Sequence, residues 1–336
     1  MRLVRFALVI AGLTVAVLAG PSISNAVDLV ACTDLICAFN GDFAVESLPL
    51  AGLSIQSSPG QIQNGVVVYT GSNGVPVTTN FAGMDNAYPA VGGKSGGTTF
   101  STTTTADPGG TGEFAGDAAG TWDSTLTAFT TFLNGATPIF FFNQNQLNSG
   151  VASANCPLAT SAQDVCVYGM LTLVDLDNSA NNVTLELEGP TTLFSGGPQP
   201  TDGIADLPDE LILARGAVCL DAVGNQVACD GNQAVGPINH NLGANEAAYA
   251  AFSDALNALL ATCAAEGVNT TNCPWDSISL RFDLGGLNNG FEQLFILTSE
   301  FVIPPPPVPV PATLLLLGSG LVGLGGGMAW RTRRRG

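Results

Sequence analysis

Residues 171–188, LTLVDLDNSANNVTLELE, consist of two short apolar arms around a polar tip. On the first arm, Leu171 and Leu173 share one face of an extended chain, because side chains alternate along a strand. On the second arm, Val183 and Leu185 do the same, alternating with threonine and glutamate. The tip, DNSANN, supplies residues that favour turns. The stretch therefore predicts an antiparallel β-hairpin with one buried face.

Further runs of strand length lie on both sides of this hairpin, and they are rich in Val, Leu, Ile, Phe and Thr. They cover residues 65–71, 136–144, 210–220, 277–286 and 292–303. Clusters of Gly, Pro and Asn separate them, which is typical of all-β sandwiches and barrels. We therefore expect a mainly β chain, with a single β-sandwich-like or jelly-roll-like ectodomain over residues 27–302.

One segment has helical rather than strand periodicity. Within residues 243–266, Tyr249, Phe252, Leu256 and Leu260 recur at spacings that place them on one face of an α-helix. Gly267 is a suitable C-terminal stop for that helix. We expect one amphipathic helix over about residues 243–266, with this stripe packed on the core.

Charge is distributed unevenly along the chain. All 27 acidic residues lie between the two arginine-bearing ends, where Lys94, Arg215 and Arg281 are the only basic residues. A body this acidic repels nucleic-acid phosphates, which need clustered Lys and Arg. We therefore expect no nucleic-acid partner, and cations are the natural small partners of the body.

The N-terminus has the three parts of a secretory signal. MRLVR is basic, FALVIAGLTVAVLAG is apolar, and the following residues end with the small side chains Ser24 and Ala26. We expect residues 1–26 to be a signal peptide that signal peptidase removes after Ala26. The mature protein would then enter an oxidising compartment.

Cysteine usage agrees with export. Eight cysteines fall into four close pairs, and such pairs in an exported chain predict local disulfides. The pairs are Cys32 with Cys37, Cys156 with Cys166, Cys219 with Cys229, and Cys263 with Cys273. Eight cysteines allow about 105 connectivities, so the pattern favours near-neighbour pairing without proving it. None of the pairs has the short spacing of a zinc site.

Several turns are rich in side-chain oxygens, so calcium is the one cofactor that the sequence leaves possible. Asp175, Asp177, Ser179 and Glu186 match spacings of an EF-hand loop, but Ala180 stands where that loop needs glycine. The flanks are predicted strands rather than helices, so an EF-hand is excluded. Asp175 and Asp177 remain candidate ligands of a looser calcium site.

Catalytic motifs are sparse. His240 is the only histidine, and the sequence has neither a nucleophile-elbow motif nor a phosphate-binding loop. We expect His240 to face solvent or cap the helix, and we expect no catalytic residue and no enzymatic activity. Trp122, with Asn143, Gln144 and Asn145, could form a sugar-binding surface by stacking and hydrogen bonding.

The C-terminal residues combine a proline linker, an apolar segment and a basic cluster. Residues 303–307, IPPPP, predict an extended polyproline II linker. Residues 312–330 carry no charge and are long enough to span a bilayer as a helix. The basic cluster beyond them would stay in the cytoplasm by the positive-inside rule; it comprises Arg331, Arg333, Arg334 and Arg335.

Directly before the apolar segment stand Val308, Pro309, Val310 and Pro311. Residues 308–336 therefore contain this motif, then a glycine-containing apolar helix, then terminal arginines. This order resembles the PEP-CTERM sorting signal of Gram-negative bacteria. The family's usual motif has Glu at the place of Val310. The resemblance implies an inner-membrane anchor before processing, cleavage by an exosortase-type enzyme, and delivery to the cell surface or outside the cell. It also implies an association with exopolysaccharide.

These features together predict an exported surface or extracellular-matrix protein with a structural or adhesive role associated with exopolysaccharide. Two alternatives stay open at this point. One is a calcium-assisted carbohydrate-binding module, which a glycan array would reveal. The other is an extracellular hydrolase, which would need a pair of carboxylates in a cleft.

Overall fold

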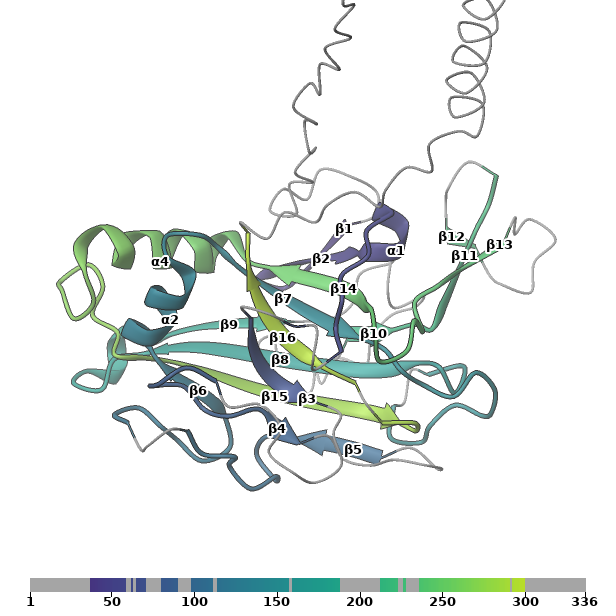
Figure 1. Cartoon of the computed structure of the whole chain (residues 1–336), viewed down its shortest axis with the longest axis horizontal. Helices are drawn as coiled ribbons and strands as arrows, with labels where there is room; N and C mark the ends of the chain where they lie inside the picture. Colours follow the sequence, from purple (N-terminus) through teal and green to yellow (C-terminus); the bar gives the residue numbers. More distant parts are fainter. Residues whose placement is uncertain are drawn as a thin grey trace, which may run out of the picture. The chain divides into compact units, whose positions relative to one another are not determined.

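The structure is a computed structural model, shown in Figure 1. It describes residues 37–58, 62, 65–70, 80–89, 98–110, 114–156, 159–187, 212–222, 226–227, 236–290 and 292–299. All of these belong to one compact unit, Asp28–Ile303. Within them the chain is mainly β with few helices, as the sequence predicted.

Seven strands form the first sheet, in the order β1-β2-β14-β7-β16-β3-β4. Their bounds are β1 Cys37–Asn40, β2 Phe43–Ser47, β14 Ala247–Phe252, β7 Pro138–Asn143, β16 Leu294–Thr298, β3 Val66–Thr70 and β4 Tyr88–Pro89. Neighbours pair antiparallel, apart from the parallel pair β3 and β4. The aromatic strand β7 lies between β14 and β16 and is buried along its whole length.

Six strands form the second sheet, in which β10, β8, β15 and β5 follow one another while β9 pairs with β8 and β6 pairs with β15. Their bounds are β10 Ile212–Ala214, β8 Val165–Val174, β15 Ser277–Leu287, β5 Thr98–Ser101, β9 Val183–Leu187 and β6 Trp122–Thr125. A smaller sheet has the order β12-β11-β13, with β12 Gln226–Val227, β11 Ala217–Leu220 and β13 Gly236–Asn239. The single predicted run 210–220 therefore supplies strands to two sheets.

The predicted hairpin is confirmed. Strands β8 and β9 pair antiparallel, with Leu171 opposite Leu185 and Leu173 opposite Val183. The side chains that were expected to share a face therefore meet across the two strands. A short 3₁₀ turn, Ser179–Asn181, forms at the polar tip.

The first two sheets share one apolar core. Phe43 and Phe140 reach it from the seven-stranded sheet, and Val167 and Leu280 reach it from the six-stranded sheet. A cavity of about 80 Å³ remains between them, and its lining offers almost no polar atom that could orient a ligand. The opposite face of the seven-stranded sheet has its own apolar cluster, which includes Phe141 stacked on Phe295 at 5.4 Å.

The helices differ in part from the prediction. Helix α4 covers Asp254–Glu266, and the expected helix start at residue 243 is wrong, because Ala247–Phe252 forms β14. These residues pair with β2 and β7 in the sheet interior, so tertiary pairing overrides the helix propensity of alanine. Ser253 then begins α4 by accepting a hydrogen bond from Leu256 N–H at 3.2 Å.

Two short helices were not predicted. Helix α1 covers Leu48–Ala51, and helix α2 covers Leu126–Leu133, directly after β6. Thr125 caps α2 by accepting from Ala128 N–H at 3.1 Å. Figure 1 shows α2 and α4 side by side at one end of the sheets.

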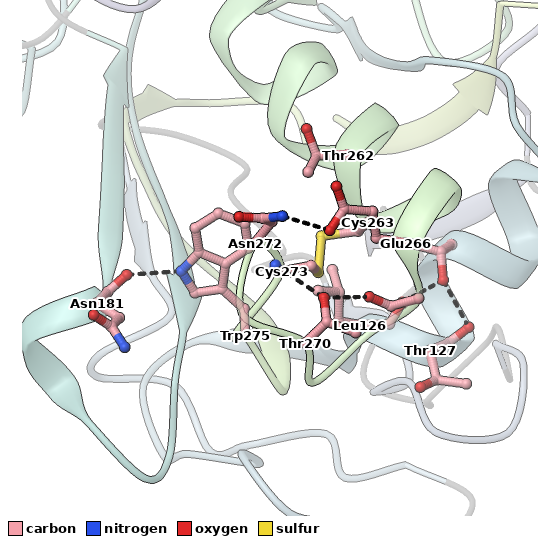
Figure 2. Close-up of a disulfide and its surroundings, with 12 residues drawn as sticks. Leu126, Thr127, Asn181, Thr262, Cys263, Glu266, Thr270, Asn272, Cys273 and Trp275 are labelled. Carbon is pink, nitrogen blue, oxygen red and sulfur yellow. Dashed lines mark hydrogen bonds between the residues drawn. A yellow bond between two sulfur atoms is a disulfide. The ribbon is translucent and has the colours of Figure 1, made fainter.

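Two predicted disulfides are present in the described residues, Cys156–Cys166 and Cys263–Cys273. Figure 2 shows the second one, which joins the last turn of α4 to the segment before β15. Beside it, Trp275 Nε1 donates to the Asn181 carbonyl at 2.7 Å, which ties the same segment to the hairpin tip. Cys219 is also disulfide-bonded. The predicted partner Cys229 and the predicted pairing of Cys32 with Cys37 fall outside the described residues.

The two ends of the chain are not among the described residues. The signal peptide 1–26, the linker 303–307 and the sorting signal 308–336 all lie there, and so does the segment 312–330 that was expected to cross the membrane. Within the described part, none of the helices combines the length and the hydropathy that a membrane span requires.

Candidate cation centre

Three aspartates from separate segments meet at the edge of the six-stranded sheet. Asp85 lies in the segment before β4, Asp117 lies in the segment before β6, and Asp123 lies on β6 itself. One carboxylate oxygen from each lies within 4.8 Å of the other two. Asp85 and Asp123 are fully buried, whereas Asp117 is partly exposed. We call these three residues the acidic centre.

Backbone pairing fixes Asp85 against β6. Met84 forms an isolated bridge with Ser124, and the Asp85 N–H donates to the Asp123 carbonyl at 2.8 Å. In return, the Asp123 N–H donates to Asp85 Oδ2 at 2.7 Å. The Asp85 carbonyl accepts from Trp122 Nε1 at 3.2 Å and from Asn80 Nδ2 at 2.7 Å. The position of Asp85 is therefore set by several independent hydrogen bonds.

Asp123 links the neighbouring loop to the sheet. Its Oδ2 accepts from the Ala118 N–H at 3.0 Å and from Thr121 Oγ1 at 2.9 Å. Its Oδ1 accepts a hydrogen bond from Ser279 on β15. Gly116, with φ of +92°, makes the turn that precedes Asp117, and a side chain there would overlap Ser277. The loop that carries Asp117 is therefore held close to β15.

Burial is the main influence on the protonation of this centre. It raises the pKa of Asp85 to about 8, and the charges of Asp107, Asp123 and Asp117 add to the effect. It raises the pKa of Asp123 to about 6, against the hydrogen bonds from Ser279, Ala118 and Thr121. Both shifts express the same physics, since negative charge is disfavoured away from water and beside like charge. The centre therefore favours binding a proton or a cation.

The donor atoms of the acidic centre are all oxygens. Such donors suit hard cations such as Ca²⁺ and Mg²⁺, whereas zinc sites are built mainly from sulfur and imidazole nitrogen. Paired carboxylates also carry out glycoside hydrolysis, but they must then flank a substrate bond. Asp85 and Asp123 are both fully buried, which keeps a polymeric substrate away from the pair.

The aspartates predicted from the sequence lie elsewhere, at the tip of the β8–β9 hairpin. The carboxylate of Asp175 accepts from Asn181 Nδ2 at 2.7 Å and from the N–H groups of Asn178 and Asp177, each at 2.9 Å. These hydrogen bonds, that of Asn181 first, hold the pKa of Asp175 below its usual value. Asp177 is exposed. The structure thus uses Asp175 to close the turn and does not bring either residue into the acidic centre.

The residues considered for sugar stacking do not form an exposed surface. Trp122 is 1% exposed and lies in the core, and Asn143 and Gln144 are fully buried. Gln144 Nε2 donates to the Ala214 carbonyl at 3.2 Å, and Asn145 Nδ2 donates to the Gly290 carbonyl at 2.6 Å. The amide nitrogens of Gln144 and Asn145 therefore already donate to backbone carbonyls and are not available to a ligand.

His240 is buried rather than solvent-facing, so that expectation was wrong. Its Nε2 lies 2.6 Å from Ser47 Oγ, and its ring stacks on Tyr249 with centroids 5.0 Å apart. Burial lowers the pKa of His240 to about 4, so the ring is neutral at ordinary pH. The Ser47–His240 pair is enclosed in the core, where it serves packing.

A family model, described as "Domain of unknown function (DUF8239)", matches residues 27–283. The match spans most of the chain. The chain belongs to this family. The matched region contains the acidic centre, both described disulfides and every strand from β1 to β14, and it ends within β15. No curated protein and no solved structure matches the chain.

One feature of the sequence points to the acidic centre, although it matches no known metal-binding motif. Asp117 and Asp123 lie close together in AGDAAGTWDST, but that stretch has no recognised ligand spacing. Asp85 joins them only through the pairing of its segment with β6. The spacing at Asp175 is that of a compact metal-binding loop, whereas the acidic centre is assembled from three segments and has no such local pattern.

Proposed function

We propose that this protein is an exported surface or extracellular-matrix protein with a structural or adhesive role associated with exopolysaccharide. Signal peptidase and an exosortase-type enzyme would process its ends, and the C-terminal helix would hold it in the inner membrane before processing. The observation that carries the proposal is the pair of disulfides built into the fold. Such bonds point to an oxidising extracellular or periplasmic environment.

The position of these disulfides supports a role outside the cell. Cys156, Cys166, Cys263 and Cys273 are all buried, and each bond closes a loop of sequence separation 10. Disulfides of this kind raise the free energy of unfolding, because they restrict the unfolded chain. A protein that must last in a matrix benefits from such restraints.

Three further observations agree with the proposal. The family match begins at residue 27, directly after the expected signal-peptide cleavage. The two larger sheets share a core, which supports a sandwich-like ectodomain of the sort that many surface proteins use. The acidic composition of the body suits a soluble protein in a matrix rich in cations.

A calcium-assisted carbohydrate-binding module is the second candidate, and the acidic centre is the observation in its favour. Its sugar contacts would have to come from residues other than Trp122, Asn143 and Gln144, which are buried. A hydrolase has less support, because the carboxylate pair of Asp85 and Asp123 is fully buried.

The experiment is fractionation of a Gram-negative producer that has an exosortase-type enzyme. We expect the mature protein in the surface or matrix fraction, with its cysteines oxidised, and co-sedimenting with the exopolysaccharide. A chain truncated before residue 308 is the matched control and should miss the surface fraction. Wild-type protein that stays in the cytoplasm with reduced cysteines would refute the proposal, and a specific hit on a glycan array would favour the second candidate.

A further inference from the structure

The buried Asp85 side chain has one carboxylate oxygen for which the described residues supply no hydrogen-bond partner. It is fully buried, and while Oδ2 accepts from the Asp123 N–H at 2.7 Å, Oδ1 has no hydrogen-bond partner. The carboxylates of Asp117 and Asp123 approach it, with one oxygen of each residue within 4.8 Å of the others. We propose that Asp85, Asp117 and Asp123 together bind one hard divalent cation, and that this cation is Ca²⁺.

Burial without a partner is the first argument. A carboxylate removed from water needs hydrogen bonds, an opposite charge or a metal ion to offset its lost hydration. Arg281 shows the usual solution, since its guanidinium pairs with the Asp283 carboxylate at 3.0 Å. Asp85 has no such pair in the described part of the chain, and its remaining neighbours of the acidic centre are carboxylates. A cation would supply the missing partner for Oδ1.

The identity of the ion follows from the ligands. Ca²⁺ accepts six to eight oxygen ligands at about 2.3–2.6 Å in flexible geometry, so two of its ligands can lie up to about 5 Å apart. Three oxygens within 4.8 Å of one another lie at most about 2.8 Å from a common centre, so small side-chain rotations would bring all three into the range of Ca²⁺ without moving the backbone. Mg²⁺ demands near-ideal octahedral geometry at about 2.0–2.1 Å and releases water reluctantly, so a rigid, partly dry centre suits it less well.

The ion would join three segments that hydrogen bonds already bring close. Asp123 holds the loop through the Ala118 N–H and Thr121 Oγ1, and Asp85 is held by β6. Asp117 is the partly exposed member, on the loop itself, and so it offers the ion a way in from solvent. Bound Ca²⁺ would therefore tie residues 114–121 to β6 and to the segment around Asp85. This inference does not depend on the proposed function, since it concerns the folded body wherever that body resides.

The test uses the exported mature protein after treatment with a chelator. Calorimetric titration with CaCl₂ should show one site with a Kd of about 10⁻⁴–10⁻³ M, the range of extracellular calcium modules. At about 10 mM CaCl₂, the melting temperature should rise by roughly 3–10 °C. Hydrogen exchange should slow in residues 114–125, which the ion would hold. MgCl₂ and NaCl at matched ionic strength should give a clearly smaller shift.

Three variants make the test specific. Asp117→Asn changes a partly exposed side chain and should abolish the calcium shift while the protein still folds. Asp85→Asn should abolish it too. Asp177→Asn removes the same charge from the exposed hairpin tip and should keep the full shift. The proposal is overturned if Asp117→Asn retains the wild-type shift, if MgCl₂ or NaCl reproduces it, or if titration detects no binding because the carboxyls only share a proton.

Discussion

Removing the disulfide Cys263–Cys273 should lower stability by a predictable amount. The bond joins α4 to the segment before β15 and has a sequence separation of 10. In the loop-entropy model, opening a loop of this size costs about 2.7 kcal/mol at 25 °C. Both cysteines are buried, so Cys263→Ala with Cys273→Ala also leaves a small void, and the expected total is about 3 kcal/mol.

The assay is urea unfolding followed by tryptophan fluorescence, with a thermal melt alongside. A loss of about 3 kcal/mol corresponds to a fall in melting temperature of roughly 6–12 °C for a domain of this size. Cys156–Cys166 has the same sequence separation of 10, so removing that bond should give a similar loss. If the Cys263 and Cys273 double variant loses less than about 1 kcal/mol, the loop-entropy reasoning does not apply to this fold.

Two further changes test other parts of the fold. Burial raises the pKa of Glu292 to about 8, so its contribution to stability is present at acid pH and is lost as the pH rises from about 4.5 to 8. The melting temperature of Glu292→Gln should therefore fall less steeply over this pH range than that of the wild type. Some fall should remain, because burial also raises the pKa of Asp85 and of Asp123. An unchanged slope would rule out this role for Glu292. Gly116→Ala should lower the free energy of unfolding more than Gly109→Ala does. Both glycines have positive φ, so alanine costs about 1–2 kcal/mol of backbone strain at either position. At Gly116 the new side chain also overlaps Ser277, which should cost about 1–3 kcal/mol more. Equal losses in chemical unfolding would mean that the loop is not held against β15.

Local patterns predicted much of the fold because local chemistry determines it. The alternation in residues 171–188 produced the hairpin with Leu171 opposite Leu185, since a strand with one buried face permits one register. Close cysteine pairs produced two disulfides. The helix at residues 243–266 was half right, because Tyr249 and Phe252 fit a helical stripe and also fit a strand. Only pairing with β2 and β7 decides between the two.

The candidate site could not be predicted in this way. Asp85 and Asp123 are 38 residues apart in sequence, and the hydrogen bond between them depends on strand pairing that no local pattern encodes. The amides of Asn143 and Gln144 look like a polar turn after a strand, yet both are buried, with Asn143 Nδ2 donating to Ser57 Oγ and Gln144 Nε2 donating to the Ala214 carbonyl. The Asp175 turn, by contrast, has the local spacing of a metal loop, but its carboxylate is already occupied by backbone and amide donors.

Intact-mass analysis of the exported protein shows whether both ends of the chain are removed during export and surface delivery. We expect a chain that begins at Val27 and ends near Pro307 to Pro311, with its cysteines oxidised. Such a mass would require both signal-peptide removal and cleavage at the sorting motif. A surface or secreted protein that still contains Trp330 would contradict cleavage of the tail, and one that retains Met1 would contradict export by signal-peptide removal.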